Sequence, residues 1–388
     1  MVLLRRVLFC GIIILLESCN GGPEPISFEP DPQLLEAQAV VPLDIGEKVP
    51  AFDLPGANGR RYQLSDFDDK EILVVVFLSN HCPQSQVYEQ RLKEFVVDYR
   101  QDVAVVAISP NSPLSVPDDQ LGYSDVDDTY ESLVLRSQEQ DLNFPYLYDG
   151  DDQQVSIKFG PPWLPTVFVF DKSRKLKYRG RLDVAPWQFG GNTEDLRLAV
   201  NAIKEEREII RPIRDTPGCK IYWSWDQNDK KTLEEEWNNS VVTLREITLD
   251  SLKTILVNFS SNIRVINFWA TWCGPCKKEF PEFLRMKRMY RHRPVEFFSV
   301  SLDSPDDQQK ALDFLTQIHA PGLNFILDES RKDLIIEKVY PSWSGTLPFT
   351  LIVDPLGEIQ RVYEGPFDPL ELRRTLVDHR LLGRLLVP

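Results

Sequence analysis

Histidine and paired cysteines are scarce in this chain of 388 residues, which has four histidines, six cysteines and a single Cys-x-x-Cys motif. A zinc site needs more ligands of these types than the sequence offers. Lys277, not a histidine, follows Cys276, so the pattern of covalent haem attachment is absent. We therefore expect no metal ion and no cofactor.

Positive charge is also in deficit, because 44 Lys and Arg stand against 59 Asp and Glu and give a formal net charge of −15. An acidic surface repels phosphate groups, so no nucleic acid is expected among the partners. The basic residues of segment 285–293 are interpreted as solvated positions on a helix.

The apolar run near the N-terminus, residues 7–16, is too short to span a bilayer comfortably and has the length of the apolar part of an export signal. Cys19 ends a Leu-Glu-Ser-Cys sequence that resembles the lipobox of bacterial lipoproteins. The resemblance implies a signal peptide over residues 1–19, lipidation of Cys19 and membrane attachment there, with an ordinary cleaved signal or an uncleaved anchor as alternatives. Residues 20–42, rich in Pro, Gly and Glu, are interpreted as a flexible tether.

The most informative stretch is Trp-Cys-Gly-Pro-Cys at residues 272–276, between a β-type apolar run and an amphipathic helical pattern. This order places two thiols at a helix N-terminus, where backbone N–H groups and the helix dipole stabilise a thiolate. Two intervening residues allow a small disulfide ring to form and reopen by exchange. The stretch therefore predicts thiol–disulfide chemistry, with a structural disulfide as the alternative.

The motif has an internal counterpart, because residues 74–85 align without gaps on residues 265–276 and place Cys82 on Cys273 and Ser85 on Cys276. Three further segments match in the same order: 103–109 with 295–301, 146–149 with 325–328, and 164–171 with 347–354. Four anchors in one order predict two copies of one fold.

Alternating strand and helix patterns predict tandem three-layer α/β/α domains at residues 43–206 and 240–388. A helix over residues 194–211 is expected to close the first domain, in which residues 110–130 are expected to form a loop. The connector, residues 207–239, contains three tryptophans. Aromatic residues at this density are unusual in a free linker, so part of the connector is expected to pack on a domain.

The second domain resembles the membrane-tethered thioredoxins of the TlpA/ResA type through Asn-Phe-Trp-Ala-Thr-Trp-Cys-Gly-Pro-Cys-Lys-Lys-Glu-Phe-Pro, residues 267–281. The resemblance implies two thioredoxin-like folds, with Cys273 as nucleophile and Cys276 as resolving thiol. Pro348 matches the cis-proline that packs against the disulfide. Glu279 matches an acidic residue that tunes the cysteine pKa in some of these proteins, with an exposed first-turn carboxylate as the alternative.

The first domain resembles the peroxiredoxin-like, AhpC/TSA-related branch of the thioredoxin superfamily through Asn-His-Cys-Pro at residues 80–83. Val75 and Ser79 stand where the peroxidase motif has Pro and Thr, so only the hydroxyl is retained, which argues against peroxidase activity. A thiol peroxidase that uses Cys82 is kept as an alternative function. Pro165 is the matching cis-proline candidate.

Cys82 is predicted at a helix N-terminus beside His81, and both features favour a thiolate. Ser85 replaces a resolving cysteine, and Cys219 is the other unpaired thiol of the mature chain. A Cys82–Cys219 disulfide, catalytic or structural, is therefore predicted, with a non-catalytic docking domain and an inert Cys82 as the alternative.

The resulting functional prediction is an extracytoplasmic thiol–disulfide oxidoreductase that exchanges disulfides with protein substrates. The resemblance implies a reductant of the cytochrome c maturation type, anchored on the periplasmic side of the cell envelope and supplied by an upstream membrane electron donor. A protein-folding oxidant or isomerase, which uses the same thiol–disulfide exchange in another direction, is a variant of this prediction.

Overall fold

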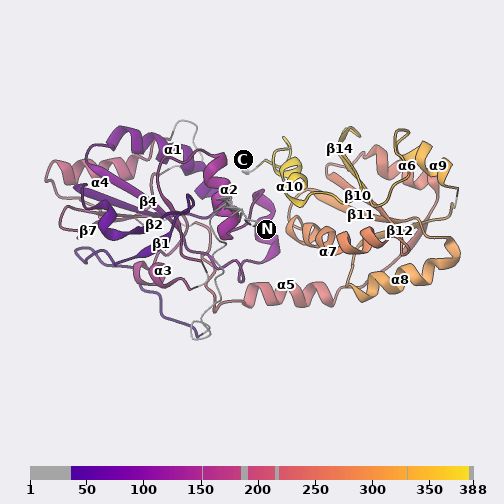
Figure 1. The fold of residues 1–388 in the computed structure, drawn as a ribbon, viewed down its shortest axis with the longest axis horizontal. Helices are drawn as coiled ribbons and strands as arrows, with labels where there is room; N and C mark the ends of the chain where they lie inside the picture. The colour runs from indigo at the N-terminus through magenta and orange to yellow at the C-terminus, as the bar shows by residue number, and fades with distance from the viewer. Residues whose placement is uncertain (1–35, 151, 185–190, 215–217, 330, 384–388) are drawn as a thin grey trace, which may run out of the picture.

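A computed structural model describes residues 36–383 except 151, 185–190, 215–217 and 330 (Figure 1). The predicted signal peptide, Cys19 and most of the predicted tether lie outside the described residues. In the described part of the chain, no helix is both long enough and apolar enough to cross a membrane.

The described residues form two separate α/β units, each built on a six-stranded mixed sheet (Figure 1). The first sheet has the order β5-β4-β3-β6-β7-β8 and the second the order β14-β13-β10-β11-β12-β9. The strands of the first sheet are β3 (Ile72–Phe77), β4 (Val103–Ser109), β5 (Tyr146–Tyr148), β6 (Thr166–Phe170), β7 (Leu176–Gly180) and β8 (Ile213–Arg214). Those of the second are β9 (Arg245–Ile247), β10 (Ile263–Trp269), β11 (Val295–Ser301), β12 (Leu323–Leu327), β13 (Phe349–Val353) and β14 (Ile359–Glu364). A small hairpin of β1 (Asp53–Pro55) and β2 (Arg61–Gln63) precedes the first sheet.

The two sheets reproduce the sequence repeat residue by residue. Val74 of β3 lies opposite Val105 in the parallel neighbour and Val169 in the antiparallel one. Its counterpart, Val265 of β10, lies opposite Phe297 and Ile352, the residues that the sequence alignment pairs with those two. The two units differ in their sixth strand, which is added at opposite edges of the shared five-strand core.

Helices cover both faces of each sheet. They are α1 (Pro83–Tyr99), α2 (Tyr130–Glu139), α3 (Gln154–Phe159), α4 (Glu194–Lys204), α6 (Leu249–Val257), α7 (Gly274–Met289), α8 (Gln308–Gln317), α9 (Lys332–Val339) and α10 (Pro369–Val377). A further helix, α5 (Asn228–Asn238), lies in the connector between the two units (Figure 1). Successive strand residues point to opposite faces, so Val74 packs under α1 and α4 while Val75 packs toward α3. In the second unit α7, α8 and α10 cover one face, and α6 and α9 the other. The predicted class, two tandem thioredoxin-like α/β/α domains, is confirmed.

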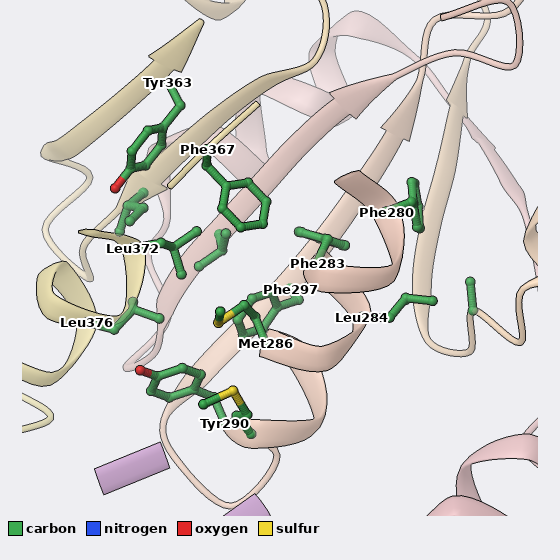
Figure 2. Packing of buried hydrophobic residues seen from close by; sticks show 14 of the residues in the cluster. Phe280, Phe283, Leu284, Met286, Tyr290, Phe297, Tyr363, Phe367, Leu372 and Leu376 are labelled. Atoms are coloured by element: carbon green, nitrogen blue, oxygen red, sulfur yellow. The ribbon is translucent and has the colours of Figure 1, made fainter. Parts of the chain in front are cut away.

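The core that supports the Cys-Gly-Pro-Cys turn lies between α7, β11 and α10. Figure 2 shows Phe283 and Met286 of α7 beside Phe297 of β11, with Leu372 and Leu376 of α10 nearby. All of these side chains are almost inaccessible to solvent. Burying large side chains along one face fixes α7, and therefore its N-terminus, against the sheet.

The connector packs on both domains, as its tryptophans predict. Trp223 lies against the first domain and stacks on Trp225, with ring centroids 5.3 Å apart. Trp237 of α5 packs against the second domain, where its indole N–H donates to the carbonyl of His319 at 2.8 Å.

One expectation for the first domain was wrong and another needs an addition. The helix predicted over 194–211 ends at Lys204, because Glu206 takes a left-handed conformation with φ of 51°. The segment predicted as a loop, 110–130, contains the 3₁₀ helix η3 (Asp118–Tyr123) and is largely buried.

The interpretation of segment 285–293 as solvated was wrong for Arg285, Arg288 and Arg293, which are partly or fully buried because α7 and α10 pack against η3 of the first domain, while Arg291 stays exposed. Asp118 accepts hydrogen bonds from Arg285 at 3.3 Å and from Arg288 at 2.8 Å. Arg291 pairs with Asp119 at 2.8 Å. The acidic segment of one domain therefore neutralises the basic face of the other, a contact between residues about 170 positions apart that no local pattern shows.

Candidate active site

The turn after β10 brings Cys273 and Cys276 together at the N-terminus of α7. Cys273 is the N-cap residue, and its Sγ accepts the backbone N–H of Cys276 at 3.2 Å. The two sulfurs form a disulfide. Cys273 is 6% exposed and Cys276 1% exposed, while the neighbouring Trp272 is 58% exposed. An incoming thiolate therefore meets Cys273 first, beside an exposed aromatic side chain.

Asp303, which the sequence analysis missed, holds this turn in place. Its carboxylate accepts the Thr271 backbone N–H at 3.0 and 3.1 Å and the Thr271 hydroxyl at 2.7 Å. Ser301 Oγ donates to the same carboxylate at 2.7 Å. The sequence feature that could have identified Asp303 is its position, two residues after the buried strand β11. At that end of the sheet the strands lie next to the active-site turn.

Glu279 lies one turn after Cys276 on α7 and is 8% exposed, so the exposed first-turn carboxylate considered as its alternative is excluded. Its Oε1 accepts from Asn267 Nδ2 at 2.8 Å and its Oε2 from the backbone N–H of Phe367 at 2.7 Å. Burial raises the pKa of Glu279 to about 7, although these two hydrogen bonds act to lower it. The carboxyl group can therefore gain or lose a proton near neutral pH.

Asn267 connects Glu279 to the strand that follows Pro348. Its Nδ2 also donates to Thr350 Oγ1 at 2.9 Å. The Leu347–Pro348 peptide bond is cis, and the Pro348 carbonyl accepts from Gly365 at 2.9 Å. A pocket of about 380 Å³ adjoins this network, lined by Pro275, Lys278, Glu279, Glu282, Pro366, Phe367 and Pro369. The structure thus places the cysteine turn, Glu279 and the segment after the cis-proline in one region.

The equivalent place in the first domain holds a second disulfide. Cys82, the N-cap residue of α1, is bonded to Cys219 of the connector. Cys82 is fully buried and Cys219 only partly so. The Leu164–Pro165 bond is also cis, and the Cys82 sulfur lies 3.6 Å from the Leu164 carbonyl oxygen. Ser85, at the position of Cys276, is buried and accepts a hydrogen bond from the backbone of Ser79.

His81 is buried and bound to Asp128, a second residue that the sequence analysis missed. His81 Nδ1 lies 2.6 Å from Asp128 Oδ2, and Asn111 Nδ2 donates to the same oxygen at 2.7 Å. Burial alone would raise the pKa of Asp128, but the His81 ring and the other donors outweigh it and lower that pKa. His81 is 3% exposed, so its ring is part of the interior and not of the surface.

No group of three or more His, Cys, Asp or Glu residues that could hold a metal ion occurs within the described ranges.

Comparison with known proteins assigns both domains to one family. The model of the AhpC/TSA family matches residues 45–179 and 243–377, so the chain belongs to this family, within the thioredoxin superfamily. Thiol-disulfide oxidoreductase ResA of Oceanobacillus iheyensis is 33% identical over 169 residues, which are 43% of this chain and 71% of the relative.

Other relatives match a shorter part. ResA of Geobacillus kaustophilus is 28% identical over 111 residues, 29% of this chain, and ResA of Bacillus subtilis is 32% identical over 102 residues, 26% of this chain. The chain spans 59% and 51% of the length of these two relatives. Among solved structures, a hypothetical protein of Sinorhizobium meliloti 1021 has 30% identity and a TM-score of 0.40, covering 47% of this chain and 95% of its own.

Proposed function

We propose that the chain is a thiol–disulfide oxidoreductase that acts on protein disulfides through Cys273 and Cys276. The observation that supports this most strongly is the asymmetry of the pair at the N-terminus of α7, where Cys273 is 6% exposed and Cys276 only 1%. The names of the ResA relatives agree with it.

In the reducing direction, the Cys273 thiolate attacks one sulfur of the substrate disulfide and the other substrate sulfur leaves as a thiolate. The Cys276 thiolate then attacks Cys273, which releases the second substrate thiolate and closes the Cys273–Cys276 disulfide. Two electrons pass from the protein to the substrate. An upstream dithiol must return them, since the disulfide form described above is the spent form.

Glu279 serves in this proposal as the proton acceptor for Cys276. It follows Cys276 by three residues on α7, which places both side chains on one side of the helix. A group whose pKa is about 7 accepts a proton readily at neutral pH and returns it in the reverse reaction. Pro348 would present its loop to the substrate beside the same disulfide.

The cellular setting is part of the proposal and depends on the resemblance to TlpA/ResA-type proteins. Residues 1–19 would direct export, lipidated Cys19 would anchor the chain at the periplasmic side of a membrane, and residues 20–42 would act as the tether. Domains over 43–206 and 240–388, joined by the connector 207–239, would then face protein substrates such as apocytochrome c.

Cys82 and Cys219 would form a second redox couple, with His81 and Pro165 beside it. Because Cys82 is fully buried and already bonded, peroxide has no free thiol to oxidise in this form of the protein. We therefore keep a peroxidase and a docking module as alternatives for the first domain and do not make either a second proposal.

The experiment is reduction of a protein disulfide, such as that of insulin, with dithiothreitol as the electron source. The Cys273→Ala variant should lose the activity. The Cys276→Ala variant, reduced, freed of dithiothreitol and then mixed with the substrate, should accumulate a mixed disulfide that mass spectrometry maps to Cys273. The double variant is the matched control and should trap nothing. Retention of activity in Cys273→Ala would contradict the proposal.

A further inference from the structure

The connector crosses the Cys82 site of the first domain in an extended form. Cys219 N–H donates to the Leu164 carbonyl at 2.8 Å, and Leu164 N–H donates to the Cys219 carbonyl at 3.0 Å. These two bonds form an antiparallel pair directly before cis-Pro165. The backbone around Cys219 is therefore bound to the first domain independently of the disulfide.

Two fully buried side chains bind the backbone that follows. Asn111 Oδ1 accepts the Tyr222 N–H at 2.9 Å. Gln153 contacts two residues of the segment at once, because its Nε2 donates to the Tyr222 carbonyl at 3.0 Å and its Oε1 accepts the Ser224 N–H at 2.7 Å. Its Nε2 also donates to the Pro110 carbonyl of the first domain. Buried amide side chains are costly unless their polar atoms are paired, so these contacts form a built site for an extended backbone.

The side chains of the segment contribute as well. Ile221 is 4% exposed and packs in the apolar cluster that includes Cys82. Tyr222 is equally buried, with its ring centroid 6.0 Å from that of His81. Asn111 also donates to Asp128, so the segment and the His81–Asp128 pair share one hydrogen-bonded network.

We propose that the first domain contains a peptide-binding groove, formed by Leu164, Asn111 and Gln153, that residues 219–224 of the same chain occupy. Binding in this groove, and not the disulfide alone, presents the Cys219 sulfur to Cys82. The ligand class is an extended, cysteine-containing peptide. Asn111 and Gln153 are positioning residues for the second redox couple. The inference rests on the proposed role of Cys82 and Cys219 as a couple, but not on that of Cys273.

The groove determines how this couple reacts with an external dithiol such as dithiothreitol. Since Cys82 is fully buried, the external thiolate attacks the Cys219 sulfur, the Cys82–Cys219 bond breaks, and Cys82 leaves as a thiolate. The second thiol of the reagent then displaces Cys219, which takes up a proton, and the reagent becomes the cyclic disulfide. Cys219 remains in the groove, so closing the bond again is an intramolecular step at high effective concentration.

Hydrogen exchange of the reduced full chain tests the groove directly. Mass spectrometry first confirms that Cys82 and Cys219 are both free in dithiothreitol. The amides of Cys219, Tyr222 and Ser224, which donate to Leu164, Asn111 and Gln153, should then stay protected. Exchange at the rate of an unstructured peptide would overturn the proposal, because the segment would be held by the disulfide alone.

A glutathione titration of the Gln153→Asn variant tests the positioning role. The shorter amide cannot reach both Tyr222 and Ser224, while asparagine tolerates the left-handed backbone of residue 153, with φ of 50°. In the oxidised chain the disulfide still holds the segment of this variant, whereas in the reduced chain the loss of two hydrogen bonds lets the segment leave the groove. The equilibrium constant for Cys82–Cys219 formation should therefore fall about tenfold. For a two-electron couple this raises the reduction potential by about 30 mV.

Gln154→Asn, at the exposed neighbouring position, is the matched control and should leave both couples unchanged. The Cys273–Cys276 couple, titrated in the same samples, should not move in either variant. Equal constants for Gln153→Asn and Gln154→Asn, or a shift of both couples together, would overturn the positioning role. Failure of Cys273–Cys276 to equilibrate at all would instead contradict the proposed function and leave the exchange result intact.

Discussion

Replacing Glu279 with Gln should remove a pH dependence of both stability and activity. Burial raises the pKa of Glu279 from 4.5 to about 7 in the folded chain. Between these two values the folded state binds more protons than the unfolded state, so stability is full below about pH 4.5 and falls as pH rises through about 7. A shift of about 2.5 units at 1.36 kcal/mol each corresponds to roughly 3 kcal/mol.

Glutamine is neutral at every pH. It can keep two hydrogen bonds if the side-chain amide of Asn267 flips, so that its oxygen and nitrogen exchange places. Its Oε1 would accept from Phe367 N–H and its Nε2 would donate to Asn267 Oδ1. The stability of the variant relative to the wild type should therefore increase by roughly 3 kcal/mol between about pH 4.5 and pH 8. The control is Glu337→Gln, at an exposed position of α9, which should show no such trend.

The assay is hydrogen exchange of the β10 amides, which reports opening of the second domain alone, at several pH values. Disulfide reduction by the same variants should show a rise in rate near pH 7 for the wild type and not for Glu279→Gln. A variant that keeps the wild-type slope in both measurements would refute the reasoning, because the titrating group would have to lie elsewhere.

Three further changes have defined outcomes. Gly122→Ala would place a Cβ 2.4 Å from the carbonyl oxygen of Met289, so the domain contact should loosen and the maximum dimension in small-angle scattering should increase; an unchanged profile would contradict the contact. Asp303→Ala removes the bonds to Thr271 and should destabilise the second domain by about 2 kcal/mol in thermal unfolding and slow disulfide exchange. Phe283→Ala should lower the free energy of unfolding in urea by about 3 to 5 kcal/mol, and a loss below about 1 kcal/mol would be inconsistent with its burial.

The repeat and the sheet cores could be predicted because their signals are local. Val74 and Val265 lie in strongly apolar runs, and the strands that pair with these runs follow the same alignment. The cysteine turn could also be predicted from the sequence, because both reactive sulfurs belong to the short segment 272–276.

The residues that organise each turn could not be predicted in the same way, because their roles arise from contacts between distant segments. Asp128 lies 47 residues from His81 in sequence, and Asp303 lies 32 residues from Thr271. The domain contact depends on Arg288 and Asp118, which are separated by 170 residues. Such pairs have no periodic or motif signal, so only the folded arrangement reveals them.

The central claim is that Cys273 and Cys276 form a reversible redox couple that donates electrons to protein disulfides. The most direct test is a glutathione titration of the chain, with each thiol trapped by alkylation and assigned by mass spectrometry. The account predicts a two-electron transition with a potential near the thioredoxin value of about −270 mV. A potential near about −120 mV would mark an oxidant and contradict the proposed direction, and a pair that stays oxidised throughout would be a structural disulfide and contradict the claim itself.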